Sequence, residues 1–194
     1  MTFVYIEIFL KVMLCLAPVY ILLRLLFCQY KKMRCNGYET NVKREAYMSV
    51  FFLYVAGILI MTLVMDGRYS SIRSMLAYAR NRVRVWEDIN LIPFRTITHF
   101  LKDAVGRDVF LINIVGNIVM FIPWGFGLGL LWKENRKAVR MIAWSVALPL
   151  FIETMQLFVG RSVDIDDWIL NFIGSLLGGL LCGLWKVTNR HDLM

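Results

Sequence analysis

The sequence predicts an all-α, polytopic membrane protein with about five transmembrane helices and an amphipathic or re-entrant segment between the second and the third. Of its 194 residues, 59% are hydrophobic, and the mean hydropathy of +0.60 is too high for an ordinary soluble domain. The apolar residues form continuous blocks of about 20, the length that crosses a hydrocarbon core. Apolar and polar positions do not alternate, so we expect helices rather than barrel strands. One integral membrane domain over residues 1–194 accounts for the chain.

Five blocks have the composition of membrane helices, at about 6–28, 46–65, 109–132, 138–159 and 168–187. The first block differs from a signal peptide, because Glu7 precedes its first cation, Lys11, and no small-residue cleavage motif accompanies it. We therefore expect this block to be retained as a helix.

The distribution of cations predicts the orientation of these helices. Eleven Lys and Arg residues lie in or beside the loop after the first block, the loop after the third and the C-terminal tail, which share one side. The positive-inside rule makes that side cytoplasmic, giving an N-out, C-in protein in the cell membrane. The 66–108 segment on the other side also holds eight cations, but long loops count less in the rule.

The net charge of +8 is explained by cations that flank helices and meet anionic lipid head groups. We therefore expect membrane lipids as partners and no nucleic acid. The four cysteines lack the paired spacing of a metal site and are expected to be free thiols: Cys15, Cys28, Cys35 and Cys182.

The long segment between the second and third blocks begins with an amphipathic pattern. Residues 68–85 combine an apolar helical stripe with basic residues, which is typical of an interfacial helix. The cations alternate from Arg80 to Arg84, which favours an extended continuation. These arginines, Arg82 and Arg84 included, either bind lipid head groups or grip an anionic substrate group such as a pyrophosphate.

The motif Asn90-Leu-Ile-Pro93-Phe94 follows. Pro93 restricts Ile92 to an extended conformation, so this segment either skims the membrane against the helix bundle or forms an ordinary turn. A short amphipathic helix at 95–104 is expected next.

Polar side chains interrupt the last three blocks at helical spacing. Asn113 and Asn117 share one helix face, and Glu153 and Gln156 share another. An ionisable carboxyl in an apolar helix costs at least a few kcal/mol and normally has a partner; Arg161, in the next loop, is the obvious candidate for Glu153. The amides either bind substrate or join helices by hydrogen bonds.

Three acids follow in the loop Gly160-Arg161-Ser162-Val-Asp164-Ile-Asp166-Asp167. Carboxylates suit calcium or magnesium, so Asp164, Asp166 and Asp167 form a candidate metal site. Alternatively, Asp166 or Asp167 caps the fifth helix. The candidate general bases are Glu153, Asp164 and Asp167. The sequence has no Ser-His-Asp or Cys-His arrangement, and we expect no cofactor other than a divalent cation.

The order and spacing of these motifs resemble the VanZ-like family over residues 46–187. The motifs are Asn90-Leu-Ile-Pro93-Phe94, Asn117 with Phe121-Ile-Pro123-Trp-Gly125, Glu153-x-x-Gln156, the acidic loop, and Asn171-x-x-Gly174-x-x-x-Gly178. The resemblance implies a small bacterial integral membrane protein connected with low-level resistance to teicoplanin, a lipid-bearing glycopeptide that targets the cell wall. It supplies no agreed catalytic residues.

Two functions fit these observations. The protein either binds at the outer face and lowers the access of glycopeptides to cell-wall precursors, or it is an enzyme acting on a lipid-linked or peptidoglycan-related substrate. The candidate binding residues are Asn90, Asn117, Gln156, Arg161, Ser162, Asn171, Arg82 and Arg84. A transporter fits less well, because no inverted repeat is evident. The glycine face of the fifth block offers a surface for a homo-oligomer.

Overall fold

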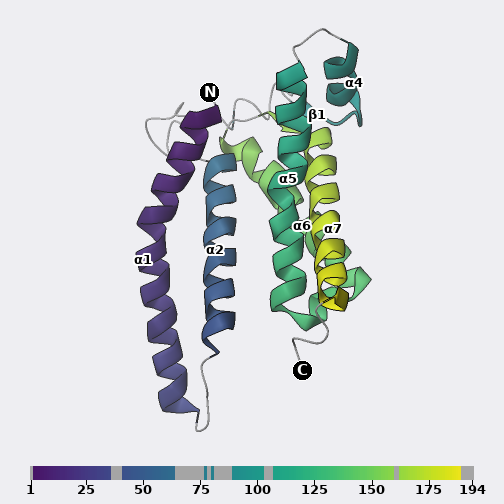
Figure 1. The fold of residues 1–194 in the computed structure, drawn as a ribbon. Coiled ribbons are helices and arrows are strands. Elements are labelled where there is room, and N and C mark those ends of the chain that lie inside the picture. Colours follow the sequence, from purple (N-terminus) through teal and green to yellow (C-terminus); the bar gives the residue numbers. More distant parts are fainter. Residues whose placement is uncertain are drawn as a thin grey trace. The chain divides into compact units, whose positions relative to one another are not determined.

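The computed structural model describes residues 2–35, 41–63, 77, 80, 89–102, 107–159 and 162–188. Its helices are α1 (Thr2–Arg34), α2 (Val42–Leu63), α4 (Arg95–Lys102), α5 (Arg107–Leu131), α6 (Ala138–Val159) and α7 (Ile165–Thr188) (Figure 1). A 3-10 turn, η1 (Lys133–Arg136), links α5 to α6, and two short strands, β1 (Ile89–Asn90) and β2 (Val163–Asp164), pair with each other.

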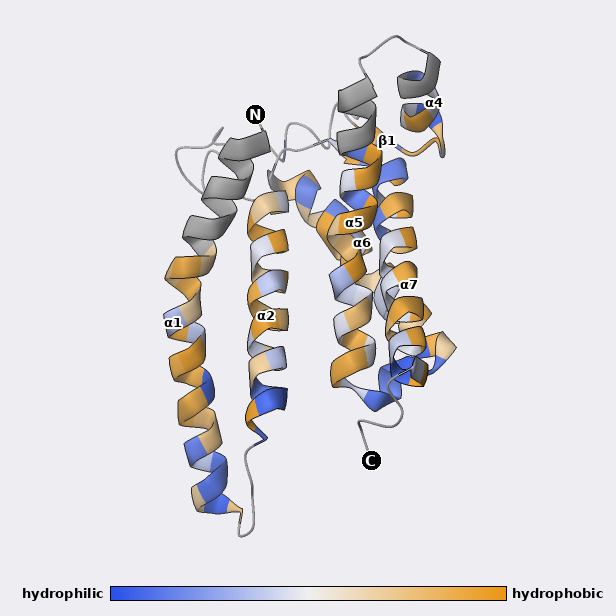
Figure 2. Ribbon diagram, in the orientation of Figure 1, coloured by the Kyte–Doolittle hydropathy of each residue, from blue (hydrophilic) through white to orange (hydrophobic). Residues whose placement is uncertain are grey.

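The all-α class and the five membrane spans are confirmed. Five helices are long and apolar enough to cross a bilayer, at Met13–Arg34, Val42–Leu63, Asn113–Leu131, Ala138–Phe158 and Ile165–Thr188. Their apolar character is visible along each ribbon in Figure 2. Many large hydrophobic side chains on these helices are exposed, Leu14 and Leu180 among them, as expected where the surrounding medium is lipid.

The described residues form two compact units, 1–61 and 62–194. In the first, α1 and α2 are joined by a charged pair in which the Arg24 guanidinium donates to the Glu45 carboxylate. Asn41 begins α2 by accepting a hydrogen bond from the Arg44 amide (3.0 Å), which is N-cap geometry.

In the second unit, α7 packs most extensively on α5, because glycines remove the side chains from the contact. A Cβ atom added to Gly178 would lie 1.9 Å from the Ile122 carbonyl oxygen, and one added to Gly125 would lie 1.8 Å from that of Ser175. Only glycine permits such a close approach of two helices. The small-residue face of α7 is therefore used for packing within the chain.

Helix α6 completes this unit through polar contacts. The Ser175 hydroxyl donates to the Ser145 hydroxyl (2.7 Å), and both side chains are fully buried. The Trp124 indole donates to the Trp144 carbonyl (3.3 Å). These bonds join α7 and α5 to α6 and fix how the three helices are turned toward one another.

Helix α5 continues through Pro123 to Leu131, close to the predicted end of the third block at 132. The start of the last helix differs from the predicted one. The fifth span begins at Ile165 rather than at 168, because polar residues of the acidic loop form its first turn. The expected amphipathic helix at 68–85 lies outside the described residues except for Ala77 and Arg80.

Candidate functional site

The acidic residues before and in the first turn of α7 hold the β1–α4 segment against the end of the helix bundle. The two strands pair in parallel, with Ile89 opposite Val163 and Asn90 opposite Asp164. This pairing aligns the segment before α4 with the segment before α7. A two-residue strand is too short for an alternating pattern, so the sequence did not predict it.

Asp166 caps helix α4 from a distant part of the chain. Its carboxylate accepts hydrogen bonds from the backbone amides of Phe94 (2.5 Å), Thr96 (2.8 Å) and Ile97 (3.1 Å). Its side chain is only 1% exposed. The free amides of a helix N-terminus attract an anion, so this carboxylate satisfies donors that nothing within α4 can satisfy.

Phe94 takes up an unusual conformation at this point. Its φ of +65° lies in the left-handed region, which costs an L residue about 1–2 kcal/mol. The bond from its amide to Asp166 offsets this cost. The conformation also turns the chain from the Asn90–Pro93 segment into α4.

Asp164 performs the cap that the sequence assigned to Asp166 or Asp167. Its Oδ1 accepts the backbone amide of Asp166 (2.9 Å), the second residue of α7. The same oxygen accepts from the Asn90 amide group (2.9 Å), and Oδ2 accepts from the Thr96 hydroxyl (2.5 Å). The expectation was wrong because the helix starts three residues earlier, which moves the N-cap back to Asp164.

Asn90, Thr96, Asp164, Asp166 and Asp167 form a polar cluster at the start of α7. Two further contacts connect this cluster to α5 and α6. The Asn117 amide group on α5 donates to Asp167 Oδ1 (2.7 Å). The Asp164 backbone amide donates to Glu153 Oε2 on α6 at 3.3 Å. Glu153 is buried, with 5% of its surface exposed, so the sequence correctly placed this carboxyl in the interior.

Several buried polar atoms near the cluster have no hydrogen-bond partner among the described residues. They are the side-chain oxygens of Gln156 on α6 and Asn171 on α7, and the indole nitrogen of Trp168. Gln156 is 7% exposed and Asn171 4%. Asn171 lies one turn beyond Asp167, and Gln156 lies one turn beyond Glu153. A buried polar atom without a partner costs about 1–3 kcal/mol. The two oxygens are therefore suited to accept hydrogen bonds from a bound molecule, and the indole N–H is suited to donate one.

The remaining predicted residues are Ser162 and three arginines. Ser162 is exposed. Arg161, Arg82 and Arg84 lie outside the described residues, so the expected pairing of Arg161 with Glu153 stays a prediction. Thr96 was missed by the sequence analysis; its only signal was its position next to the Pro93-Phe94 turn.

The carboxylate oxygens of Asp164 and Asp166 are occupied by hydrogen bonds from within the protein. Among the described residues, the donors to Asp164 and Asp166 are neutral amides and one hydroxyl. Both carboxylates lie at helix N-termini, where negative charge is favourable. Within all the residues that the structure describes, no group of three or more His, Cys, Asp or Glu side chains is arranged to hold a metal ion.

The fold and the cluster define a polytopic helical membrane protein whose polar residues gather where its last helix begins. The chain belongs to the VanZ/LLP1 family, whose model matches residues 51–186. It is similar to the protein VanZ of Enterococcus faecium, with 31% identity over 104 residues. The chain spans about half of that relative, since the match covers 53% of this chain and 55% of the other. No solved structure matches the chain significantly.

Proposed function

We propose that this protein lowers the susceptibility of a bacterial cell to lipid-bearing glycopeptides such as teicoplanin, by binding rather than by catalysis. Its membership of the VanZ/LLP1 family and its likeness to VanZ support the link to resistance. The protein lies in the cell membrane with its N-terminus outside, so the start of α7 faces the side where cell-wall precursors are exposed. The polar cluster at the start of α7 restricts the access of the antibiotic to these precursors.

The observation that carries this proposal is the use of the acidic residues as helix caps. A general base needs a lone pair within hydrogen-bond reach of the proton that it removes. Asp166 is buried and accepts three amides of the α4 N-terminus, and Asp164 accepts from Asn90, Thr96 and α7. These two carboxylates therefore organise the site and are poorly placed to serve as bases.

The groups that we assign to ligand binding are then the buried amide side chains of Gln156 and Asn171, whose oxygens have no hydrogen-bond partner among the described residues. The oxygens of Gln156 and Asn171 accept hydrogen bonds, and the Trp168 indole donates one. Sugars and peptides supply matching hydroxyl and amide groups, and both are present in glycopeptides and in cell-wall precursors. Replacing either amide by an apolar side chain of similar size removes the acceptor with little change in packing volume.

The test is teicoplanin susceptibility of a sensitive Gram-positive host that expresses wild type or variants at equal membrane levels. The binding variants are Gln156→Leu and Asn171→Leu. The matched control is Gln29→Leu, which makes the same change at an exposed position of α1. We expect wild type and the control to protect, and both binding variants to lose protection.

Two outcomes contradict the proposal. If the Leu variants protect as well as wild type, the amides do not bind the relevant molecule. If they protect while Glu153→Gln alone abolishes protection, the buried Glu153 carboxylate acts as a base, and the enzyme hypothesis replaces the binding one. Analysis of the cell-wall precursors in the same strains then identifies the altered product.

A further inference from the structure

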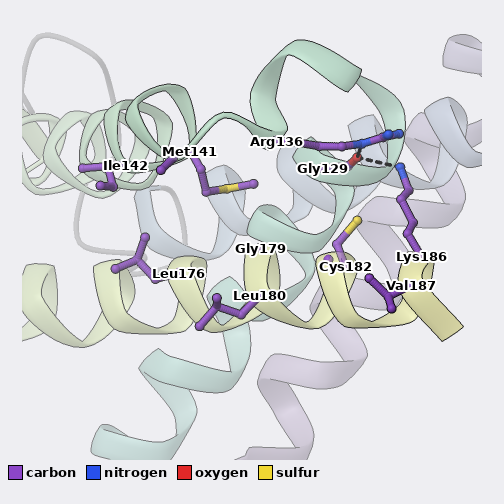
Figure 3. Close-up of a pocket in the computed structure, with 12 residues that line it drawn as sticks. Gly129, Arg136, Met141, Ile142, Leu176, Gly179, Leu180, Cys182, Lys186 and Val187 are labelled. Atoms are coloured by element: carbon purple, nitrogen blue, oxygen red, sulfur yellow. Dashed lines mark hydrogen bonds between the residues drawn. The ribbon is translucent and has the colours of Figure 1, made fainter.

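A second site of different chemistry lies near the other end of α7. A partly open cavity of about 840 Å³ is lined by residues of α5, η1, α6 and α7, a volume within the range of ligand pockets. Its wall is mainly apolar, with Met141 and Ile142 from α6 and Leu176 and Leu180 from α7. Figure 3 shows these side chains around one part of the cavity and two cations at the other. An apolar chain fits the first part.

The two cations converge on one carbonyl. Arg136 Nε and Lys186 Nζ each donate to the Gly129 carbonyl oxygen at 2.9 Å, and Lys186 also approaches the Leu130 carbonyl at 3.5 Å. A guanidinium has five N–H donors and an ammonium three, so both retain donors beyond these bonds. No acidic residue is among the described residues that line the cavity; Glu134 of η1 is the nearest along the chain and is exposed. This end therefore favours an anion.

The position of the cavity relates it to the bilayer. Twenty residues separate Asp166 from Lys186, which corresponds to about 30 Å along a helix, the thickness of a hydrocarbon core. The acidic cluster and the cationic cavity therefore belong to opposite membrane faces. The cationic end lies at an interface, where phosphate groups are found, and the apolar part extends from it along the helices into the hydrocarbon region.

We propose that this cavity binds an anionic phospholipid, with an acyl chain along the apolar wall and the phosphate against Arg136 and Lys186. A ligand of this site must be apolar over most of its length and anionic at one end, and a membrane lipid meets both requirements. Basic pockets between transmembrane helices are a known form of lipid site.

Native mass spectrometry of the purified full-length chain in detergent tests this proposal, with phosphatidylglycerol and phosphatidylcholine of identical acyl chains as probes. Two basic residues near a membrane surface predict a preference of about 30-fold for the anionic lipid. The Arg136→Gln, Lys186→Gln double variant is expected to lose this preference. The Lys137→Gln, Arg140→Gln double variant, which removes two exposed cations at the start of α6, is expected to keep it.

A second pair of variants tests the apolar part without altering charge. A Cβ atom at Gly183, which lines the cavity, meets no atom within 4 Å, and the same holds for Gly116 on α5, which does not line it. Both glycines therefore tolerate a side chain. Gly183→Phe is expected to weaken binding of both lipids at least tenfold, whereas Gly116→Phe binds them like wild type.

Each of the following outcomes would overturn the proposal: no preference of wild type for phosphatidylglycerol, an equal loss of preference in both charge variants, or wild-type binding by Gly183→Phe. Inorganic phosphate provides the last arm. If it displaces phosphatidylglycerol at equal concentration, the site recognises free phosphate and the acyl chain contributes nothing. If the Arg136 variant does not fold, the glycine pair still decides.

Discussion

Asp166, a residue of α7, caps the N-terminus of α4, and the free energy that this cap contributes can be predicted from its contacts. Replacing Asp166 by Asn leaves one acceptor oxygen where the carboxylate has two, one facing Phe94 and the other facing Thr96 and Ile97. Whichever way the amide group turns, its NH₂ meets at least one backbone N–H, and that donor loses its partner. The loss of one such bond costs about 1–3 kcal/mol, and the lost charge at the helix N-terminus adds about 0.3–2 kcal/mol.

We therefore expect Asp166→Asn to destabilise the docking of α4 by about 1–5 kcal/mol. The assay is hydrogen–deuterium exchange of the chain in nanodiscs, measured at the amides of Phe94, Thr96 and Ile97. Because local opening sets the exchange of such amides, their exchange should accelerate about 5- to 4000-fold. Asp166→Ala, which removes all three acceptor contacts, should accelerate it further.

The matched control is Glu134→Gln, a loss of the same charge from an exposed residue of η1. Amides in the middle of α7 should exchange at the wild-type rate in every variant, which separates local release of α4 from global unfolding. If exchange of the three amides in Asp166→Asn stays within a factor of about two of wild type, the cap contributes less than about 0.5 kcal/mol, and the assignment of Asp166 as an organising residue is refuted.

Two other predictions concern helix packing, and thermal unfolding in detergent measures both. Gly178→Ala should destabilise the protein by about 1–3 kcal/mol through overpacking, because its Cβ would lie 1.9 Å from a backbone oxygen of α5. Gly183→Ala, with open space around its Cβ, should be neutral or stabilising by up to about 1 kcal/mol. Equal stability of the two variants would contradict the close-packing argument. Arg24→Gln and Glu45→Gln should show a coupling free energy of about 1–3 kcal/mol in a double-mutant cycle, because the charged pair is partly buried. A coupling near zero would mean that the contact does not hold α1 to α2.

The caps illustrate where sequence reasoning reached its limit at the site. The spacing of Asn117, Glu153 and Asn171 placed polar groups on helix faces, and Glu153 and Asn171 are buried. The same spacing did not reveal that Asp166 belongs to α4, because the two elements are about 70 residues apart and no local periodicity links them.

The sequence by itself determined the class of the protein, the number of its membrane spans and its family. These properties follow from local quantities: block length, composition and motif order. The tertiary structure alone decided which acid caps which helix and which glycines of α7 pack directly against the α5 backbone. It also decided that Gly129, Arg136 and Lys186 meet beside an apolar cavity. Helical periodicity states which residues share a face, whereas the choice of facing helix depends on how the whole bundle packs.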